Sequence, residues 1–288
     1  MNDDHAYPSL GEGHPQGDGQ WAFGTGFEDP LHGADTTVPD GVDIEELAAC
    51  CLLLADDALV AAQRLAQWCT CAPELEEEVA LANIGLDLLG QARLLYARAG
   101  QVDGTGRGED AYAYFRDAAR FRNVRLVELP NGDFAFSIAR LLVFSAWRLA
   151  LFERLTDTAD PILAAIATKG IKELEYHRLY AAQWVVRLGD GTAQSRLRMQ
   201  RALDEVAPHL AELFAPQDGL NEFLRADPTS VREETTALVG RVLDAAGLVL
   251  AQTQSAAGGG RDGLHTEHLT VLLAELQSVA RADPQATW

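Results

Sequence analysis

The stretch ALANIGLDLLGQAR, residues 80–93, decides the fold. Mostly apolar side chains recur along it, and just beyond it, at steps of three and four residues: Leu81, Ile84, Leu88, Gln91 and Leu95. Such steps place side chains on one face of an α-helix. Pro73 can open this helix, and the acidic residues that follow suit the positive end of the helix dipole. The sequence therefore predicts an amphipathic helix from Pro73 to about Arg98.

Other long segments show the same periodicity. The predicted helices span residues 43–70, 73–98, 111–126, 134–152, 161–188, 192–214, 228–255 and 264–281. Strand signals are nearly absent, because no alternating β-branched run is bounded by hairpin turns. Short links after residues 70 and 156 predict antiparallel neighbours. The predicted fold class is all-α, a bundle of long helices with additional helices.

Composition limits the partners of this chain. It has 288 residues, a formal net charge of −20 and a pI near 4.6. An acidic surface repels phosphate backbones and anionic lipid, so no nucleic acid and no membrane is expected as a partner. No stretch approaches the roughly 18 uninterrupted apolar residues of a membrane span, and the N-terminus lacks a signal pattern. We therefore expect a cytoplasmic protein.

The cysteines are expected to be reduced and structural. Cys50 and Cys51 lie in an apolar run, and Cys69 and Cys71 flank the end of a predicted helix. Neither pair has the C-x-x-C spacing of zinc sites. Free cysteine is often buried as a small apolar residue, which favours a packing role.

Residues 1–41 differ in composition and periodicity from the rest of the chain. They contain eight acids, no lysine or arginine, and no helical or strand period. This composition predicts a disordered acidic N-terminal extension. At Asp43, which can cap a helix with Glu46 at the capping-box position, the periodic sequence begins. A helical domain is therefore predicted over residues 42–288.

Long-helix bundles often hold two irons with one Glu from each of two helices and a Glu-x-x-His pair from each of two others. The predicted interior stripes offer Leu88-x-x-Gln91 and Leu174-x-x-His177 at this spacing. Leucine cannot bind iron, and glutamine replaces one imidazole. These four residues are therefore interpreted as degenerate former metal positions, with no metal ligand and no catalytic residue in this chain.

Several acids lie near these stripes: Asp56, Asp57, Asp87, Glu173 and Glu175. Glu173 and His177 are four residues apart and can bond each other or a lone metal ion, although a histidine satisfied in the core is favoured. Buried carboxylates without a cation are unstable unless they are paired or protonated. The only two lysines, Lys169 and Lys172, lie on the same predicted helix. We hypothesise that one lysine, with Lys172 as the residue to test, or a nearby arginine neutralises the former site, against the alternative that both face solvent.

Four motifs, in the same order, resemble the PaaC-like subunits of ring-1,2-phenylacetyl-CoA epoxidases. They are residues 80–93, LPNGDF at 129–134, KELEYH at 172–177 and GLHTEHL at 263–269. The resemblance covers residues 44–288 and excludes the N-terminal extension. It implies a ferritin-like bundle and a non-catalytic structural subunit. In the last motif, His265, Glu267 and His268 are crowded onto one turn, which favours capping or an interface over metal binding.

The resemblance also implies partners and cofactors. The catalytic ferritin-like subunit PaaA would hold the di-iron centre and bind phenylacetyl-CoA, with a small subunit, PaaB. A reductase, PaaE, would carry flavin and an iron–sulfur cluster and use NADPH. The chain itself would carry no cofactor.

The family is associated with contacts to the CoA part of the substrate at the subunit junction. The candidates here are Arg120, Phe121, Arg122 and Asn123. Arginines suit phosphates, a phenyl ring can stack on adenine, and an amide can bond its edge. The alternative is a helix whose Arg120 and Arg122 pair with Asp117 or a partner chain.

Two other functions stay open on the sequence. One is a self-sufficient di-iron oxygenase whose ligands lie elsewhere, which would contain about two irons. The other is a helical binding protein outside phenylacetate metabolism, which would not associate with a catalytic ferritin-like chain.

Overall fold

The computed structural model describes residues 36–216, 220–224, 228–251 and 259–285. Residues Ala34–Trp288 form one compact unit. The described part of this unit contains helices and no strand, so the predicted all-α class is confirmed. Most of the predicted extension, up to residue 35, lies outside the described residues. The first helix begins at Ile44, after Asp43.

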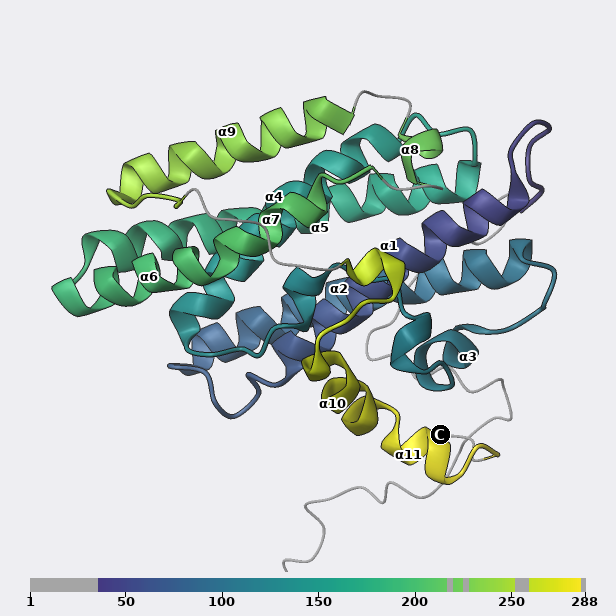
Figure 1. The fold of residues 1–288 in the computed structure, drawn as a ribbon, viewed down its shortest axis with the longest axis horizontal. Helices are drawn as coiled ribbons and strands as arrows, with labels where there is room; N and C mark the ends of the chain where they lie inside the picture. The colour runs from purple at the N-terminus through teal and green to yellow at the C-terminus, as the bar shows by residue number, and fades with distance from the viewer. Residues whose placement is uncertain (1–35, 217–219, 225–227, 252–258, 286–288) are drawn as a thin grey trace, which may run out of the picture. The chain divides into compact units, whose positions relative to one another are not determined.

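Four long helices form the core of the unit (Figure 1). They are α1 (Ile44–Ala66), α2 (Leu75–Val102), α4 (Phe134–Leu155) and α5 (Pro161–Asp190). Consecutive helices pack as two antiparallel pairs, α1 with α2 and α4 with α5, and α2 also packs against α5. The connections after Ala66 and Leu155 are short, which favours antiparallel packing of each helix on the next. In this arrangement the apolar stripes of the two helices bury each other.

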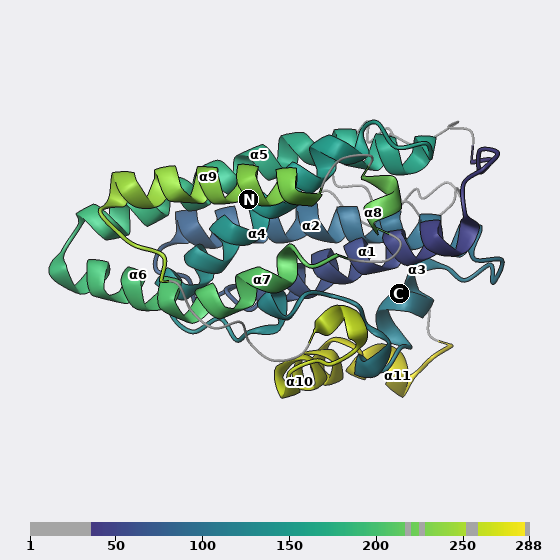
Figure 2. The ribbon, with the colours of Figure 1, turned by 45° about the horizontal axis from the view of Figure 1, so that its top comes forward.

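Shorter helices cover parts of this core. They are α3 (Glu109–Tyr114), α6 (Ala193–Val206), α7 (Leu210–Leu213), α8 (Leu220–Phe223), α9 (Pro228–Ala246), α10 (Glu267–Leu276) and α11 (Ser278–Ala282). Helices α6 and α9 pack on both α4 and α5. Figure 2 shows α10 and α11 beside α3, on the side of the bundle away from α9.

Helix α4 is the central element. Nearly all of its residues are buried, from Ala135 to Phe152. Within the described residues it alone is long and apolar enough to cross a membrane, yet 94% of its most apolar window is buried inside the protein. Burial of that extent is typical of the core helix of a helical bundle.

Two cysteines pack in this core as expected. Cys50 and Cys51 are fully buried on α1, and burial raises the pKa of Cys50 to about 12. Cys69 and Cys71 are exposed in the turn after α1, and all four are free. The predicted helix to residue 70 ends instead at Ala66, and a turn follows in which Thr70 adopts a left-handed φ of 69°.

The predicted helix over residues 111–126 was wrong. Helix α3 ends at Tyr114, short 3-10 turns cover Ala118–Arg120 and Arg125–Glu128, and Phe121 has an extended φ of −74° and ψ of 154°. The backbone N–H groups of Arg122 and Val124 donate to carboxylates of α1. Carboxylates far away in the sequence thus accept these N–H groups in place of the carbonyls of a local helix. The periodicity of apolar residues contains no information about such long-range hydrogen bonds.

Two other predicted helices are shorter than expected. The helix predicted to run to residue 255 ends at Ala246, where Gly247 has a φ of 63° and Leu248 N donates to Leu243 O at 2.9 Å. This is the glycine-terminated end typical of helices. The helix predicted over residues 192–214 breaks after Val206, because Pro208 has no N–H to continue it.

A buried ion pair joins the two helix pairs. Asp160 caps α5 by accepting the N–H of Leu163 at 2.8 Å, and its carboxylate also pairs with Arg98 of α2. Both side chains of the pair are fully buried. One carboxylate therefore starts α5 and fixes α5 against α2.

We expect Asp160→Ala to lower the free energy of unfolding by roughly 3–5 kcal/mol, because it leaves the Arg98 guanidinium buried without its carboxylate. The control is Asp43→Ala, which removes the exposed cap of α1 and is expected to cost about 1 kcal/mol. Urea denaturation measures both values. Equal losses for the two variants would contradict a special role for the buried pair.

Candidate functional site

The four residues interpreted above as degenerate metal positions lie on α2 and α5, which pack against each other. Leu88 and Leu174 are fully buried, and Gln91 and His177 are 2% and 1% exposed. Gln91 Nε2 donates to Glu173 Oε2 at 2.8 Å, and His177 Nε2 lies 3.0 Å from Asp87 Oδ2. Side-chain hydrogen bonds therefore connect α2 and α5 at these positions, which we call the seam. In a catalytic bundle of this kind the same positions would hold metal ligands.

A buried arginine completes this seam. Arg148 of α4 is fully buried, its Nε donates to Gln91 Oε1 at 2.9 Å, and its Nη1 donates to the carbonyl of Leu54 at 3.1 Å. Its guanidinium lies 4.5 Å from the centre of the Phe152 ring. Burial lowers the pKa of Arg148 to about 10, so the group stays protonated at neutral pH. A buried guanidinium therefore bonds Gln91 from α4.

The lysine hypothesis is wrong for Lys172, and a different lysine forms an ion pair. Lys172 is exposed, whereas Lys169 Nζ lies 3.4 Å from Glu173 Oε1, with 36% and 18% of the two side chains exposed. An ion pair as exposed as this one contributes little by itself. The nearby arginine that the hypothesis allowed is present as Arg148, which is linked to Glu173 through Gln91.

A di-iron centre does not fit these residues. Iron needs several anionic or imidazole donors that converge on it, whereas two of the four positions are leucines and a third is an amide that already bonds a buried cation. The carboxylates and the imidazole beside them, Glu173, Asp87 and His177, are hydrogen-bonded to other side chains. Elsewhere in the described part of the chain, one group of acids could share an ion, Glu74, Glu76 and Glu77. That group is the acidic first turn of α2, where carboxylates suit the helix dipole.

A second polar cluster begins with two adjacent acids on α1. Asp56 and Asp57 are both fully buried. Asp56 pairs with Arg116 and accepts the Tyr96 hydroxyl at 2.6 Å. Asp57 pairs with Arg261, the closest contact being 2.6 Å. The two carboxylates thus anchor arginines from the segment after α3 and from the segment before α10.

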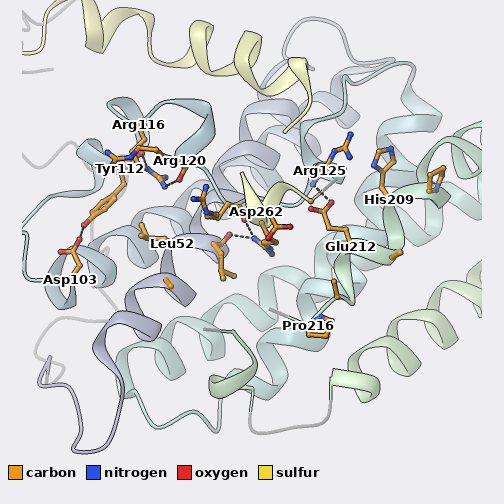
Figure 3. A pocket seen from close by; sticks show the side chains of 18 of the residues that line it. Leu52, Asp103, Tyr112, Arg116, Arg120, Arg125, His209, Glu212, Pro216 and Asp262 are labelled. Carbon is orange, nitrogen blue, oxygen red and sulfur yellow. Dashed lines mark hydrogen bonds between the residues drawn. The ribbon is translucent and has the colours of Figure 1, made fainter. Parts of the chain in front are cut away.

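These arginines line a cavity of about 810 Å³ beside α1 (Figure 3). Its basic residues are Arg107, Arg116, Arg120, Arg122, Arg125, Arg261 and His209, and its acids are Asp103, Glu212 and Asp262. In Figure 3, Tyr112, Arg116 and Arg120 lie at one end, and Arg125 and His209 lie at the other. Six arginines and three acids line this cavity, and two of the arginines, Arg116 and Arg261, are already paired with the α1 carboxylates.

The arginines of this cavity differ in how exposed their side chains are and in whether they form ion pairs. Arg116 and Arg261 have only 10% of their side chains exposed and are fixed by the two α1 carboxylates. Arg107 and Arg120 are exposed. Glu212 accepts the N–H of Gly260 at 2.6 Å, and a Cβ at Gly260 would lie 2.1 Å from the carbonyl of Asn123. Glycine is therefore required where the segment before α10 closes against the arginine segment.

The structure separates the four residues predicted to bind CoA. Arg120 and Arg122 line the cavity, whereas Phe121 and Asn123 are fully buried. The Arg116 guanidinium lies 4.3 Å from the centre of the Phe121 ring, so this ring cannot stack on a ligand. The amide of Asn123 donates to Glu128 at 3.0 Å. The predictions for Phe121 and Asn123 were wrong because the segment is extended and alternate side chains point inward.

Glu128 joins the arginine segment to the C-terminal helices. Its fully buried carboxylate bonds His265 Nδ1 and accepts the N–H of Thr266 at 2.8 Å. His265 Nε2 lies 2.8 Å from the carbonyl of Phe121, which can only accept. The imidazole therefore donates from both nitrogens as an imidazolium. Thr266 makes no side-chain cap bond to α10, so within the chain this motif joins the C-terminal helices to Glu128, and the expected interface contact stays a prediction.

Sequence reasoning did not identify most of these cationic residues, although the pattern around Arg148 contained a signal for a buried cation. Arg148 lies three residues after Ser145 and four before Phe152, on the apolar stripe of α4. A charged side chain on such a stripe indicates a buried cation with polar partners. Arg116 and Arg261 had no local signal, because their carboxylates are 60 and 204 residues away in the chain.

We expect the His265 network to stabilise the fold more at low pH than at high pH. Burial opposes the charged imidazole, but the bonds to Glu128 and to the Phe121 carbonyl outweigh it and raise the pKa of His265 above its ordinary value. This stabilisation is fully present below the ordinary pKa of about 6.5 and is lost as pH rises through the higher folded pKa.

Urea denaturation of the wild type and of His265→Gln at pH 6 and pH 9 tests this expectation. The difference in unfolding free energy should be larger at pH 6. His268→Gln, in the same segment but outside the Glu128 network, is the control and should show little dependence. If the unfolding free energy lost in His265→Gln increased with pH, His265 would not be a stabilising imidazolium.

Comparison with known proteins assigns this sequence to a family. The model of the family described as phenylacetic acid catabolic protein matches residues 33–288. The C subunit of the 1,2-phenylacetyl-CoA epoxidase of Escherichia coli strain K12 is 45% identical over 249 residues. The match covers 85% of this chain and all of that relative.

Proposed function

The chain belongs to the phenylacetic acid catabolic protein family, whose fold is a ferritin-like helical bundle, and we propose that it is the non-catalytic structural subunit of a 1,2-phenylacetyl-CoA epoxidase. A subunit role in phenylacetate catabolism follows from its likeness to the Escherichia coli relative. The structural character of that role rests on one observation. A buried Arg148 bonds Gln91 at the seam where a catalytic bundle would need metal ligands.

The catalytic work then belongs to other chains of the complex. We assign the di-iron centre and the acyl group of phenylacetyl-CoA to the ferritin-like subunit PaaA, with PaaB as the small subunit. PaaE would deliver electrons from NADPH through flavin and an iron–sulfur cluster. These nucleotide-dependent steps favour a cytoplasmic location for the assembly.

The two rival functions are less well supported. A self-sufficient oxygenase with ligands elsewhere would need another cluster of ligands, and within the described residues the one group close enough to share an ion is Glu74, Glu76 and Glu77 at the start of α2, of which two are exposed. A binding protein outside this pathway is difficult to reconcile with a family match that extends over residues 33–288. The structural subunit is the function that the seam and the family relation support together.

We expect the purified chain to contain well under one iron per polypeptide, because Leu88, Gln91 and Leu174 stand where a di-iron site needs carboxylate and imidazole ligands. The measurement is metal analysis by mass spectrometry after aerobic purification, on this chain and on the separated catalytic partner. The partner supplies the positive control, with about two irons. Stoichiometric iron in this chain, with a di-iron absorption band, would contradict the structural role.

The arginine cavity is the place where this subunit would contact the CoA part of the substrate. Arg107 and Arg120 are exposed, and Arg122 lines the same cavity. Guanidinium groups bind phosphates through charge-assisted, often bidentate hydrogen bonds. A CoA thioester carries a pyrophosphate and a ribose phosphate, so its nucleotide end matches several arginines that line one cavity.

We expect Arg120→Ala with Arg122→Ala to weaken binding of phenylacetyl-CoA to the assembled complex by about 1.5–3 kcal/mol for each phosphate bond lost. The dissociation constant is measured by calorimetry on the complex without NADPH, so that the substrate is not consumed. The matched control is Arg198→Ala with Arg201→Ala, which removes two exposed arginines of α6 outside the cavity. An unchanged constant in an intact complex would remove Arg120 and Arg122 from the substrate contact.

A further inference from the structure

The turn between α1 and α2 carries two thiols that neither the core nor the arginine cavity uses. The packing role expected for all four cysteines is confirmed for Cys50 and Cys51, which are fully buried. It is wrong for Cys69 and Cys71, which are exposed and free and do not line the cavity. Free cysteine stabilises a fold as a small buried residue, so packing does not explain this second pair.

The backbone turns sharply between these two thiols. Thr70, which separates them, has a left-handed φ of 69°, an unusual conformation for a β-branched residue. The carbonyl of Trp68 accepts the N–H groups of Cys71 at 2.9 Å and of Ala72 at 3.1 Å. The chain therefore folds back at Thr70 instead of running through it in an extended conformation.

A tight turn keeps the Cα atoms of the two cysteines within reach of a disulfide. In a helical turn, residues i and i+2 lie about 5.4 Å apart, given a rise of about 1.5 Å and a rotation of about 100° per residue on a radius of about 2.3 Å. A left-handed turn is the mirror image and has the same separation. Disulfides join Cα atoms about 4.4–6.8 Å apart, whereas an extended chain separates residues i and i+2 by about 6.6–7.2 Å.

The turn is fixed at its base by Trp68. This side chain is 9% exposed, and its indole Nε1 donates to Ser137 Oγ at 3.0 Å. Its ring also packs edge-to-face on Phe134, with the ring centres 5.9 Å apart. Both partners belong to α4, the central helix of the core. The two thiols are therefore held at the surface by a turn that is anchored in the core.

We propose that Cys69 and Cys71 are a redox-responsive site, in which hydrogen peroxide converts the two thiols into a reversible disulfide within the turn. Peroxide oxidises accessible cysteines reversibly where a second cysteine stands ready to resolve the first product. In a reducing compartment a thiol of the glutathione class would reduce the exposed disulfide again, so the bond responds to oxidation and is no permanent part of the fold. This proposal uses residues of this chain alone and is independent of the proposed function.

The reaction consumes one peroxide molecule for each pair of thiols. One sulfur, as its thiolate, attacks a peroxide oxygen: the S–O bond forms, the O–O bond breaks, and hydroxide leaves and takes up the proton that the first thiol released. The other sulfur attacks the resulting sulfenic acid: the S–S bond forms, the S–O bond breaks, and the oxygen leaves as water with the second thiol proton. The two sulfurs lose two electrons, which the two peroxide oxygens gain.

The internal disulfide has an advantage over the competing reactions. Burial raises the pKa of Cys50 and of Cys51, so the thiolate that reacts with peroxide is scarce at the buried pair. A thiol two residues away acts at an effective concentration of about 1 mM, against about 1 µM for the thiol of a second molecule in a dilute sample. The internal bond should therefore form roughly a thousandfold faster than a bond between two chains.

The test exposes the full, reduced chain to hydrogen peroxide in dilute solution, alkylates the remaining thiols and maps the cysteines by mass spectrometry. In the wild type we expect a peptide in which Cys69 and Cys71 have lost two hydrogen atoms and resist alkylation until dithiothreitol is added. Cys50 and Cys51 are the internal control and should stay thiols. In Cys71→Ser, dimedone should trap a sulfenic acid at Cys69, because the resolving thiol is missing. Both substituted side chains of the pair are exposed, so circular dichroism should show unchanged helix content for Cys69→Ser and Cys71→Ser.

Phenylarsine oxide gives a second readout that needs no oxidation, because trivalent arsenic binds two neighbouring thiols at once. The reduced wild type should bind about one equivalent, and Cys69→Ser and Cys71→Ser should each bind at least about tenfold more weakly. Equal binding by wild type and variants would show that the two thiols do not act as a pair and would overturn the proposal. Disulfide-linked dimers or sulfinic acid as the main peroxide products of the wild type, with no internal disulfide, would overturn it as well.

Discussion

Two neighbouring carboxylates on one helix set the arrangement of the functional half of this molecule. Asp56 and Asp57 are fully buried, and consecutive residues on a helix point about 100° apart. One therefore reaches the segment after α3, where it holds Arg116 and the N–H of Arg122. The other reaches Arg261 and the N–H of Val124. Because both anions are buried, both arginines must come to them, and the cavity forms between the segments so anchored.

The same reasoning explains how the bundle tolerates its polar interior. Buried ion pairs add little net stability compared with apolar packing, but loss of one partner is strongly destabilising. Arg148 is the exception, because its direct partners are an amide and a backbone carbonyl rather than a carboxylate. Its charge is supported at a distance by Asp57, although Arg261 opposes it. A guanidinium held by neutral dipoles therefore links α1, α2 and α4.

Periodicity predicted the long helices well, because their stripes are local and repeat over many turns. It failed where long-range polar bonds decide the backbone. Residues 116–124 contain enough apolar residues to look helical, yet carboxylates 60 or more positions earlier extend them. The same error misplaced Phe121 and Asn123, since an extended segment alternates its side chains between the cavity and the core. Lys172 was singled out as a rare residue, but rarity says nothing about burial.

The positions interpreted as former metal positions also show how α2 and α5 are held together. Two of them are fully buried leucines, and at the other two Gln91 bonds Glu173 and His177 bonds Asp87 across the helices. A carboxylate withdrawn from water needs a polar or cationic partner, and here neutral side chains on the facing helix supply one. Side-chain hydrogen bonds therefore make the contacts between α2 and α5 that metal ligands would make in a catalytic bundle.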